Sequence, residues 1–188
     1  MNTVREKLID FMDTTVFLKG VENEDLRQKI EVFYSSLTSE LDTSGISLAE
    51  ILQCRLLIVK EEGGRILGIS GVLKGNYTFD VVKKEYQNRK IGRVLLEELV
   101  KWAQKAGYDF VMGNTLVSNV KINRICREMG WRVLYTSVLG GREHYLQFNS
   151  LNWRGVVWGC VLKILWFVRT PNWLVGLLSK MLKILRLT

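Results

Sequence analysis

Residues 81–96 read VVKKEYQNRKIGRVLL, and more can be inferred from this stretch than from any other. The pattern predicts a β-strand, then a tight basic turn, then a helix. The first turn of a helix leaves backbone N–H groups without partners, and the helix dipole adds positive charge at the same end. Arg89, Lys90 and Arg93 bring three full charges, and no acidic residue follows them before Glu97. The stretch therefore predicts a phosphate-binding turn.

The flanking sequence predicts strands and helices in a mixed order. Apolar or alternating runs indicate strands at residues 15–19, 56–59, 66–73, 78–82, 110–112, 133–139 and 144–148. Apolar residues at helical spacing indicate helices at residues 3–13, 24–37, 47–53, 91–106 and 118–129, with Asn23, Ser47 and Ser118 as N-caps. Two pairs of adjacent glycines indicate hairpins. We predict an α/β (α+β) fold with a mixed, mostly antiparallel central sheet flanked by helices.

Charge is unevenly distributed along the 188 residues. The net charge is +8, but residues 151–188 contain six basic residues and no acidic one, which leaves +2 for residues 1–150. We therefore expect a domain of residues 1–150 followed by a basic, apolar helical tail of residues 151–188. The nearly neutral body argues against nucleic acid as a partner. Three separated cysteines and a single histidine argue against a metal site and fit reduced thiols in the cytoplasm.

Four stretches, taken in order, resemble the GNAT superfamily of acyl-CoA N-acyltransferases. Residues 17–26 resemble its first strand and acid-rich first helix, and residues 58–72 resemble its central hairpin. Residues 87–92 resemble its pyrophosphate loop, Gln/Arg-x-x-Gly-x-Gly/Ala, and residues 119–131 resemble Asn-x-x-Ala-x-x-Leu-Tyr-x-x-x-Gly-Phe. The resemblance implies a GNAT-like fold over residues 14–149. The alternative is a generic α/β domain in which Gly92 serves only helix packing.

The resemblance also implies acetyl-CoA as the co-substrate and direct attack of an amine on its thioester. The pantetheine arm would pair with the main chain of Val81, Val82 and Lys83, and Asn119 would contact the arm from the other side. The pyrophosphate would lie on the loop formed by Gln87, Asn88, Arg89, Lys90, Ile91, Gly92 and Arg93. Such chemistry needs proximity, an oxyanion donor, a base for the ammonium and an acid for the thiolate.

Two positions depart from the family pattern. Lys90 replaces a glycine, so strain would weaken the loop if φ there is positive, unless the Lys90 side chain itself reaches a phosphate. Cys126 replaces the tyrosine that protonates the departing thiolate. A thiol is more acidic than a phenol, but it is shorter, and a free cysteine is more often a core residue. Tyr135 or Tyr145 is the alternative acid.

The base that deprotonates the amine is open between several candidates. Asp80 lies on the strand expected beside the cofactor groove, on the face opposite Phe79 and Val81. His144 lies on a late strand, and histidine is the residue type that titrates near neutral pH. A chain of water molecules, which leaves no single residue as the base, is the third possibility.

The tail combines apolar and basic residues. Residues 155–168 are apolar except for Lys163, Pro171 interrupts the pattern, and residues 172–188 predict an amphipathic helix whose narrow polar face is wholly basic. Such a helix fits an anionic membrane surface. Packing on the domain or a homodimer interface is the alternative.

These features together predict an N-acetyltransferase acting on a primary amine, either a small molecule or a lipid-linked one. We expect it in the cytoplasm, peripheral on the inner face of the membrane. One alternative is a soluble small-molecule or protein N-acetyltransferase whose tail forms a dimer interface. Another is a catalytically inactive membrane module that binds coenzyme A.

Overall fold

The computed structural model describes residues 14–18, 23–37 and 46–167. The helix expected at residues 3–13 and the amphipathic helix expected at residues 172–188 lie outside this described part.

The chain divides into two compact units, residues 1–108 and residues 109–188. We call them unit 1 and unit 2 and describe each by itself. The boundary predicted at residue 150 stays a prediction.

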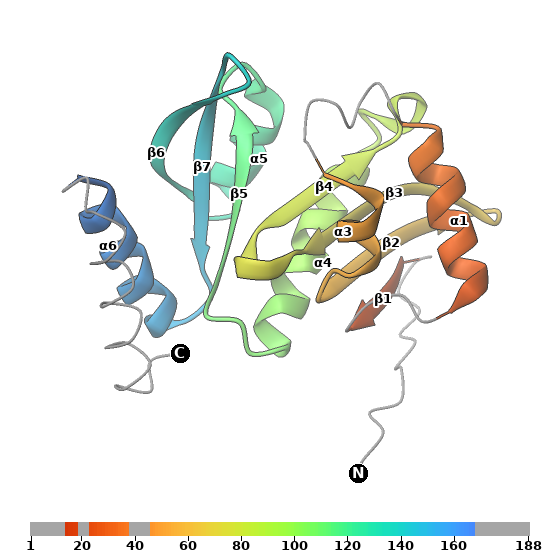
Figure 1. Ribbon diagram of the computed structural model, residues 1–188, viewed down its shortest axis with the longest axis horizontal. Helices are drawn as coiled ribbons and strands as arrows, with labels where there is room; N and C mark the ends of the chain where they lie inside the picture. The colour runs from red at the N-terminus through yellow and green to blue at the C-terminus, as the bar shows by residue number, and fades with distance from the viewer. Residues whose placement is uncertain (1–13, 19–22, 38–45, 168–188) are drawn as a thin grey trace, which may run out of the picture. The chain divides into compact units, whose positions relative to one another are not determined.

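Unit 1 contains a four-stranded sheet with the order β1-β2-β3-β4, in which every neighbouring pair is antiparallel (Figure 1). Its strands are β1 (Thr14–Leu18), β2 (Leu56–Glu62), β3 (Arg65–Val72) and β4 (Thr78–Val82). Its helices are α1 (Glu24–Ser35), α3 (Leu48–Leu52) and α4 (Ile91–Lys105), and its 3₁₀ turns are η1 (Lys74–Asn76) and η2 (Lys84–Tyr86). The strands and helices predicted within the described residues of unit 1 are confirmed.

The β2–β3 hairpin forms because Gly63 and Gly64 adopt positive φ angles of 55° and 75°, as a two-residue hairpin turn requires. Alternation along the strands then gives the sheet two apolar faces. One face packs against α1 and α3 and contains Leu57, Val59, Ile69, Phe79 and Val81. Helix α4 covers the opposite face (Figure 1).

The buried side of α4 differs slightly from the predicted one. Helical spacing from Ile91 predicts Val94 on the apolar face of the helix, but Val94 is 40% exposed, whereas Leu96 is buried beside Leu95 and Leu99. The buried arc is therefore centred about one residue later than the sequence pattern indicated, and the N-terminal turn of α4 contributes little to the core.

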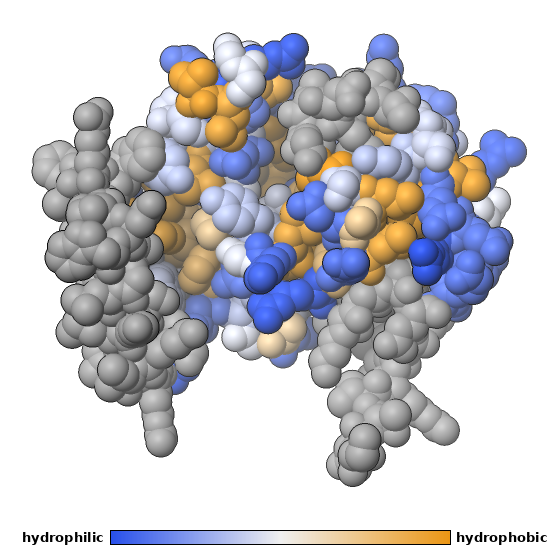
Figure 2. Space-filling model, viewed as in Figure 1, coloured by the Kyte–Doolittle hydropathy of each residue, from blue (hydrophilic) through white to orange (hydrophobic). Residues whose placement is uncertain are grey.

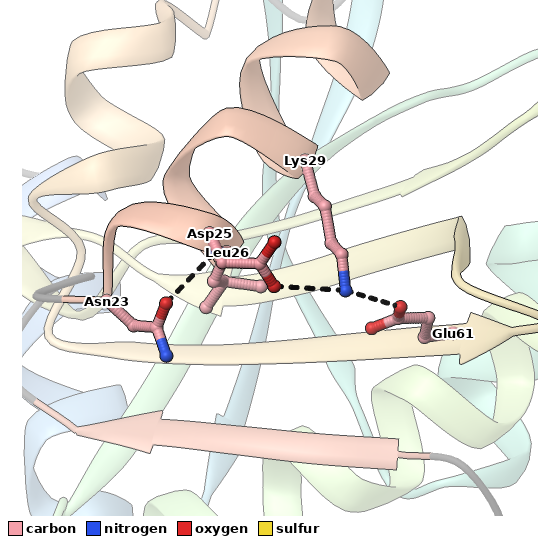
Figure 3. Close-up of polar contacts among 5 residues, drawn as sticks. All are labelled: Asn23, Asp25, Leu26, Lys29 and Glu61. Carbon is pink, nitrogen blue, oxygen red and sulfur yellow. Dashed lines mark hydrogen bonds and ion pairs between the residues drawn. The ribbon is translucent and has the colours of Figure 1, made fainter.

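Helix α1 is held by a hydrogen bond at its N-terminus and by ion pairs in its middle (Figure 3). Asn23 is the N-cap, as predicted, and its Oδ1 accepts a hydrogen bond of 3.2 Å from the Leu26 amide. Lys29 Nζ lies 3.2 Å from Asp25 and 3.0 Å from Glu61 of β2, so it joins the helix to the sheet. The outer side of α1 is mostly hydrophilic (Figure 2), as expected of an amphipathic helix.

Unit 2 contains a three-stranded antiparallel sheet with the order β5-β7-β6 (Figure 1). Its elements are β5 (Phe110–Leu116), α5 (Val120–Glu128), β6 (Arg132–Leu139), β7 (Arg142–Ser150) and α6 (Trp153–Phe167). Strand β5 extends beyond the predicted residues 110–112 because all of it pairs with β7. The predicted fold class is confirmed, with the strands distributed over two sheets.

Helix α6 packs on the sheet of unit 2. Phe110 stacks on Phe148 with ring centroids 5.1 Å apart, and Trp158 of α6 lies 5.9 Å from Phe110. A Cβ atom at Gly155 would overlap the Asp109 carbonyl oxygen, and one at Gly159 would lie 3.0 Å from the Phe148 ring. These two glycines therefore permit close approach of α6 to the sheet of unit 2. No helix within residues 23–37 and 46–167 is both long and apolar enough to cross a membrane.

Candidate active site

The predicted phosphate turn follows β4 directly. Phe79 and Val81 fix β4 in the core, and the chain then makes the turn η2 before α4 begins. The Gln87 side chain closes this turn, because its Nε2 donates to the Val82 carbonyl at 3.3 Å. The Gln87 amide donates to the Lys84 carbonyl at 3.2 Å, so it is used within the turn.

Two non-glycine residues of the loop adopt a left-handed conformation. Asn88 has φ of 67° and Lys90 has φ of 63°. Asparagine tolerates this region, whereas lysine does so at a cost of about 1–2 kcal/mol. The condition under which the sequence predicted strain is therefore met at Lys90.

The N-terminus of α4 has open backbone donors. Lys90 is its N-cap residue and makes no side-chain cap. Among the described residues, the amides of Arg89, Lys90, Ile91 and Gly92 have no hydrogen-bond partner. These consecutive donors at the positive end of a 15-residue helix form an arrangement suited to a phosphate group.

Two of the three cations near the loop already have neighbours. The Arg89 guanidinium lies over the Tyr86 ring, 5.3 Å from its centroid. Arg93 Nε lies 2.9 Å from Glu97 Oε1, so this carboxylate one turn along the helix opposes an anion at Arg93. The positive charge at the loop is smaller than a count of basic residues indicates.

Gly92 is not required by helix packing. A Cβ atom there would lie 3.6 Å from Val82 Cγ2, which is an ordinary van der Waals distance. By contrast, a Cβ atom at Gly68 would lie 2.9 Å from the Val81 carbonyl oxygen, so there the packing of strand and helix does require glycine. The absence of a side chain at Gly92 instead keeps its amide accessible.

Asp80 lies on β4 with its side chain opposite Phe79 and Val81, as predicted. Its register partner on β3 is Ser70, and directly paired residues share a face of the sheet. Asp80 Oδ1 and Ser70 Oγ are buried, and neither has a well-formed hydrogen bond among the described residues. Burial raises the pKa of Asp80 to about 6, and the nearby Ser70 hydroxyl offsets part of this rise. A carboxyl group with this pKa is mostly ionised at neutral pH yet basic enough to accept a proton.

Asn119 is the N-cap of α5, and its Oδ1 accepts a hydrogen bond of 3.3 Å from the Ile122 amide. The prediction that Ser118 caps this helix is therefore wrong by one residue. Cys126 lies about two turns further along the helix and is 4% exposed. Its burial fits the interpretation as a core residue and leaves its role in proton transfer open.

His144 and Tyr135 lie on the other face of the sheet of unit 2. His144 and Leu146 alternate with Tyr145 and Gln147 along β7, and Tyr135 pairs with Leu146. Tyr135 and His144 thus share the face that packs on α6, whereas Cys126 lies on α5 at the opposite face (Figure 1). His144 is 9% exposed, and its Nδ1 has no hydrogen-bond partner within the described residues. The structure therefore does not bring Cys126 and His144 together within unit 2.

Asn123 was not singled out from the sequence, yet it organises α5. Its Oδ1 accepts from Thr115 Oγ1 and Gln147 Nε2, both at 2.7 Å. Its Nδ2 donates to the carbonyls of Leu116 at 2.9 Å and Val117 at 3.2 Å. The available signal was a polar residue at helical spacing from the cap Asn119. No group of three or more His, Cys, Asp or Glu side chains that could hold a metal occurs in the described part of the chain.

Known proteins place this arrangement in a family. The family model described as the acetyltransferase (GNAT) family matches residues 23–131, which is more than half of the chain. The chain belongs to the acetyltransferase (GNAT) family. Membership makes it an acyl-CoA-dependent acetyltransferase, and it confirms the predicted enzyme class and the predicted co-substrate, acetyl-CoA, at the level of the family. No curated protein matches the chain significantly.

Solved structures support the same fold in this family member. Ard1 from Thermoplasma volcanium has a TM-score of 0.58 at 13% identity, covering 74% of this chain and 98% of Ard1. The yncA structure from Salmonella typhimurium, solved with its cofactor acetyl-CoA, has a TM-score of 0.55 at 18% identity, covering 74% and 94%. A chimera of the spermidine N-acetyltransferase SpeG from Vibrio cholerae and hSSAT has a TM-score of 0.57 at 14% identity, covering 73% and 96%. At these identities the similarity shows the fold.

Proposed function

We propose that this acetyltransferase transfers an acetyl group from acetyl-CoA to a primary amine by direct attack of the amine on the thioester. The observation that carries the proposal is the loop before α4, where four consecutive amides have no hydrogen-bond partner among the described residues and lie at the positive end of the helix dipole. A pyrophosphate supplies acceptors for such donors. In the same proposal the pantetheine arm pairs with the main chain at Val81, Val82 and Lys83, and Asn119 contributes from α5.

Asp80 is our choice for the base that takes the proton from the attacking ammonium. Its Oδ1 is buried and has no hydrogen-bond partner among the described residues, and its raised pKa keeps it basic at neutral pH. His144 is the weaker choice, because its side chain lies on the face of the unit 2 sheet that packs on α6. Cys126 and Tyr135 remain the candidates for protonating the departing thiolate of coenzyme A.

Amine acetylation can be tested directly by following release of free coenzyme A with a thiol reagent while a panel of amines is supplied. Spermidine is a sensible first member, because a protein of similar fold is a spermidine N-acetyltransferase. Turnover that depends on an added amine, together with a mass increase of the amine by one acetyl group, supports the proposal. Binding of acetyl-CoA without transfer to any primary amine would refute it.

We also propose that the enzyme works at the cytoplasmic surface of an anionic membrane and that its acceptor is lipid-linked. The support is the basic, acid-free sequence of residues 151–188, together with exposed apolar side chains on α6 at Trp153, Val156 and Val157. The competing hypothesis, a soluble enzyme whose tail forms a dimer interface, draws on the same apolar surface.

Membrane binding is best tested with charge variants of the full chain. Truncation at Asn149 would remove α6 and expose Phe148, so it would damage unit 2. Glutamine at Lys180, Lys183 and Arg186 removes half of the tail's positive charge. Co-sedimentation with vesicles containing anionic lipid should fall in this variant but persist in a control with glutamine at Lys84, Lys101 and Lys121. Equal sedimentation of the two variants would contradict the membrane proposal.

A further inference from the structure

Unit 2 contains a pocket that shares no residue with the predicted acetyl-CoA site. It has a volume of about 190 Å³ and is lined by Asn123, Arg127, Trp131, Val133, Tyr145 and Gln147. These residues come from α5, from the residue range just after it, and from β6 and β7. Because a water molecule occupies about 30 Å³ of liquid, the pocket has room for about six, well below the size of a drug-like site. A suitable ligand is therefore a small molecule of about one ring.

The polar side chains at the base of the pocket are held in place by hydrogen bonds to one another and to the backbone. Gln147 Nε2 donates to Asn123 Oδ1 and to Thr115 Oγ1, both at 2.7 Å. Asn123 Nδ2 donates to two carbonyl groups at the end of β5. These bonds fix α5 against the sheet, so the pocket exists before any ligand binds, which lowers the entropic cost of binding.

Two positively polarised groups of the pocket lack partners. Trp131 is 5% exposed, and its indole Nε1 is buried without a hydrogen-bond acceptor among the described residues. Arg127 is exposed, and its guanidinium forms no ion pair in the described part of the chain. The Arg127 guanidinium is therefore available to an anionic group of a ligand, whereas solvent does not reach the indole nitrogen.

The rest of the lining favours a flat apolar ligand with negative charge. Trp131 and Tyr145 provide aromatic surface, and Val133, which is 45% exposed, adds aliphatic surface. The lining residues include one cation and no carboxylate. Arginine pairs with carboxylates through two parallel hydrogen bonds, which gives it geometric selectivity as well as attraction.

We propose that this pocket binds a small aromatic carboxylate. Its ring lies against Trp131 and Tyr145, and its carboxylate pairs with the Arg127 guanidinium. The proposal does not depend on how acetyl-CoA is bound, because no residue predicted to bind it lines the pocket; Tyr145, named above as an alternative acid, enters here only through its ring. The pocket is lined by residues of α5, the helix that follows Asn119 and carries Cys126, and by Trp131 just after that helix. A ligand in the pocket therefore contacts the helix that carries Cys126.

The test uses the full chain labelled with ¹⁵N in its tryptophan indole groups, with benzoate as the probe. The six tryptophans give six indole N–H signals, and Trp131→Phe identifies the one from Trp131. We expect that signal to shift saturably at millimolar benzoate. Arg127→Gln, at an exposed position that leaves folding intact, should weaken binding about fivefold, the effect of one partly exposed charge pair.

The matched controls vary one property at a time. Arg132→Gln removes a neighbouring exposed charge that does not line the pocket, and should leave benzoate affinity unchanged. Benzamide keeps the ring but not the charge, and should bind at least fivefold more weakly. A Trp131 signal that does not shift, a loss of affinity that is equal in Arg127→Gln and Arg132→Gln, or equal binding of benzamide and benzoate would each overturn the proposal.

Discussion

Asp80 should make the protein less stable as the pH rises from 4 to 7. Its pKa is about 6 in the folded chain, against an ordinary value of about 3.9 in the unfolded chain. Between these values the unfolded state has released the proton while the folded state retains it, so the unfolded state binds fewer protons and the free energy of unfolding falls with pH. A difference of about two pKa units corresponds to about 3 kcal/mol. This contribution to stability is intact below about pH 4 and lost above about pH 6.

Chemical denaturation of wild type and Asp80→Asn across this pH range isolates the effect. The difference between the two unfolding curves should change by about 3 kcal/mol from pH 4 to 7, with the variant relatively more stable at high pH. Glu85→Gln, which removes an exposed carboxylate near the loop, controls for net charge and should retain the wild-type slope. Parallel curves for wild type and Asp80→Asn would refute the reasoning that Asp80 is buried and protonated below pH 6.

The pH dependence of the rate shows whether Asp80 is the catalytic base or only a buried acid. If Asp80 accepts the proton from the amine, log kcat/KM should rise with unit slope below about pH 6 and then level off. Asp80→Asn should lose this limb and about two to four orders of magnitude in rate. A variant that loses the stability slope but keeps the acidic limb of the rate profile would show that another group is the base.

Four further variants test the loop and α5. Lys90→Gly should raise stability by about 0.5–1 kcal/mol in thermal unfolding, because relief of the left-handed strain exceeds the entropy that glycine gains in the unfolded chain. Lys90→Ala should not raise stability. The acetyl-CoA affinity of Lys90→Gly, measured by calorimetry, should stay within a few fold of wild type. Gly92→Ala should be neutral or stabilising by up to about 1 kcal/mol in urea unfolding. A large loss of stability would indicate instead that Gly92 is required by helix packing. Asn123→Ala should lower the free energy of unfolding by about 2–3 kcal/mol in the same assay. The substitution removes one hydrogen-bond partner from Gln147 Nε2 and from two neighbouring polar groups. If the Cys126 thiol protonates the leaving group, Cys126→Ala should lower the rate of coenzyme A release at least tenfold. An unchanged rate would show that Cys126 takes no part in the mechanism.

The elements of the fold follow from local signals that act within a few residues. Asn23 caps α1 through the Leu26 amide, and Gly63 and Gly64 set the β2–β3 turn, so both could be predicted from residue type and spacing alone. The end of β5 could not, because Gly113 and Asn114 belong to residue types that are depleted in strands. They are held in the strand by pairing with Gln147 and Leu146 of β7, which is distant in the sequence.

The candidate site was predictable in its main chain and not in its side chains. The loop sequence indicated open amides before α4, but it did not reveal that Arg93 pairs with Glu97 at 2.9 Å. The left-handed backbone at Lys90 was identified only as a possibility, since a lysine there has no compensating signal in the sequence. The burial that raises the pKa of Asp80 and the position of Ser70 opposite it follow from the register and packing of β3 and β4, which the local sequence does not show.

The register of unit 2 also limits how protons can move there. Cys126 lies on the helix that covers one face of the sheet, whereas Tyr135 and His144 lie on the face that packs on α6. A single reaction centre within unit 2 therefore cannot contact all three side chains. If Cys126 donates the proton to the departing thiolate, His144→Gln should affect stability through its buried position but leave the pH dependence of kcat unchanged. If both Cys126→Ala and His144→Gln instead altered the pH profile of one chemical step, the assignment of these residues to opposite faces would be wrong.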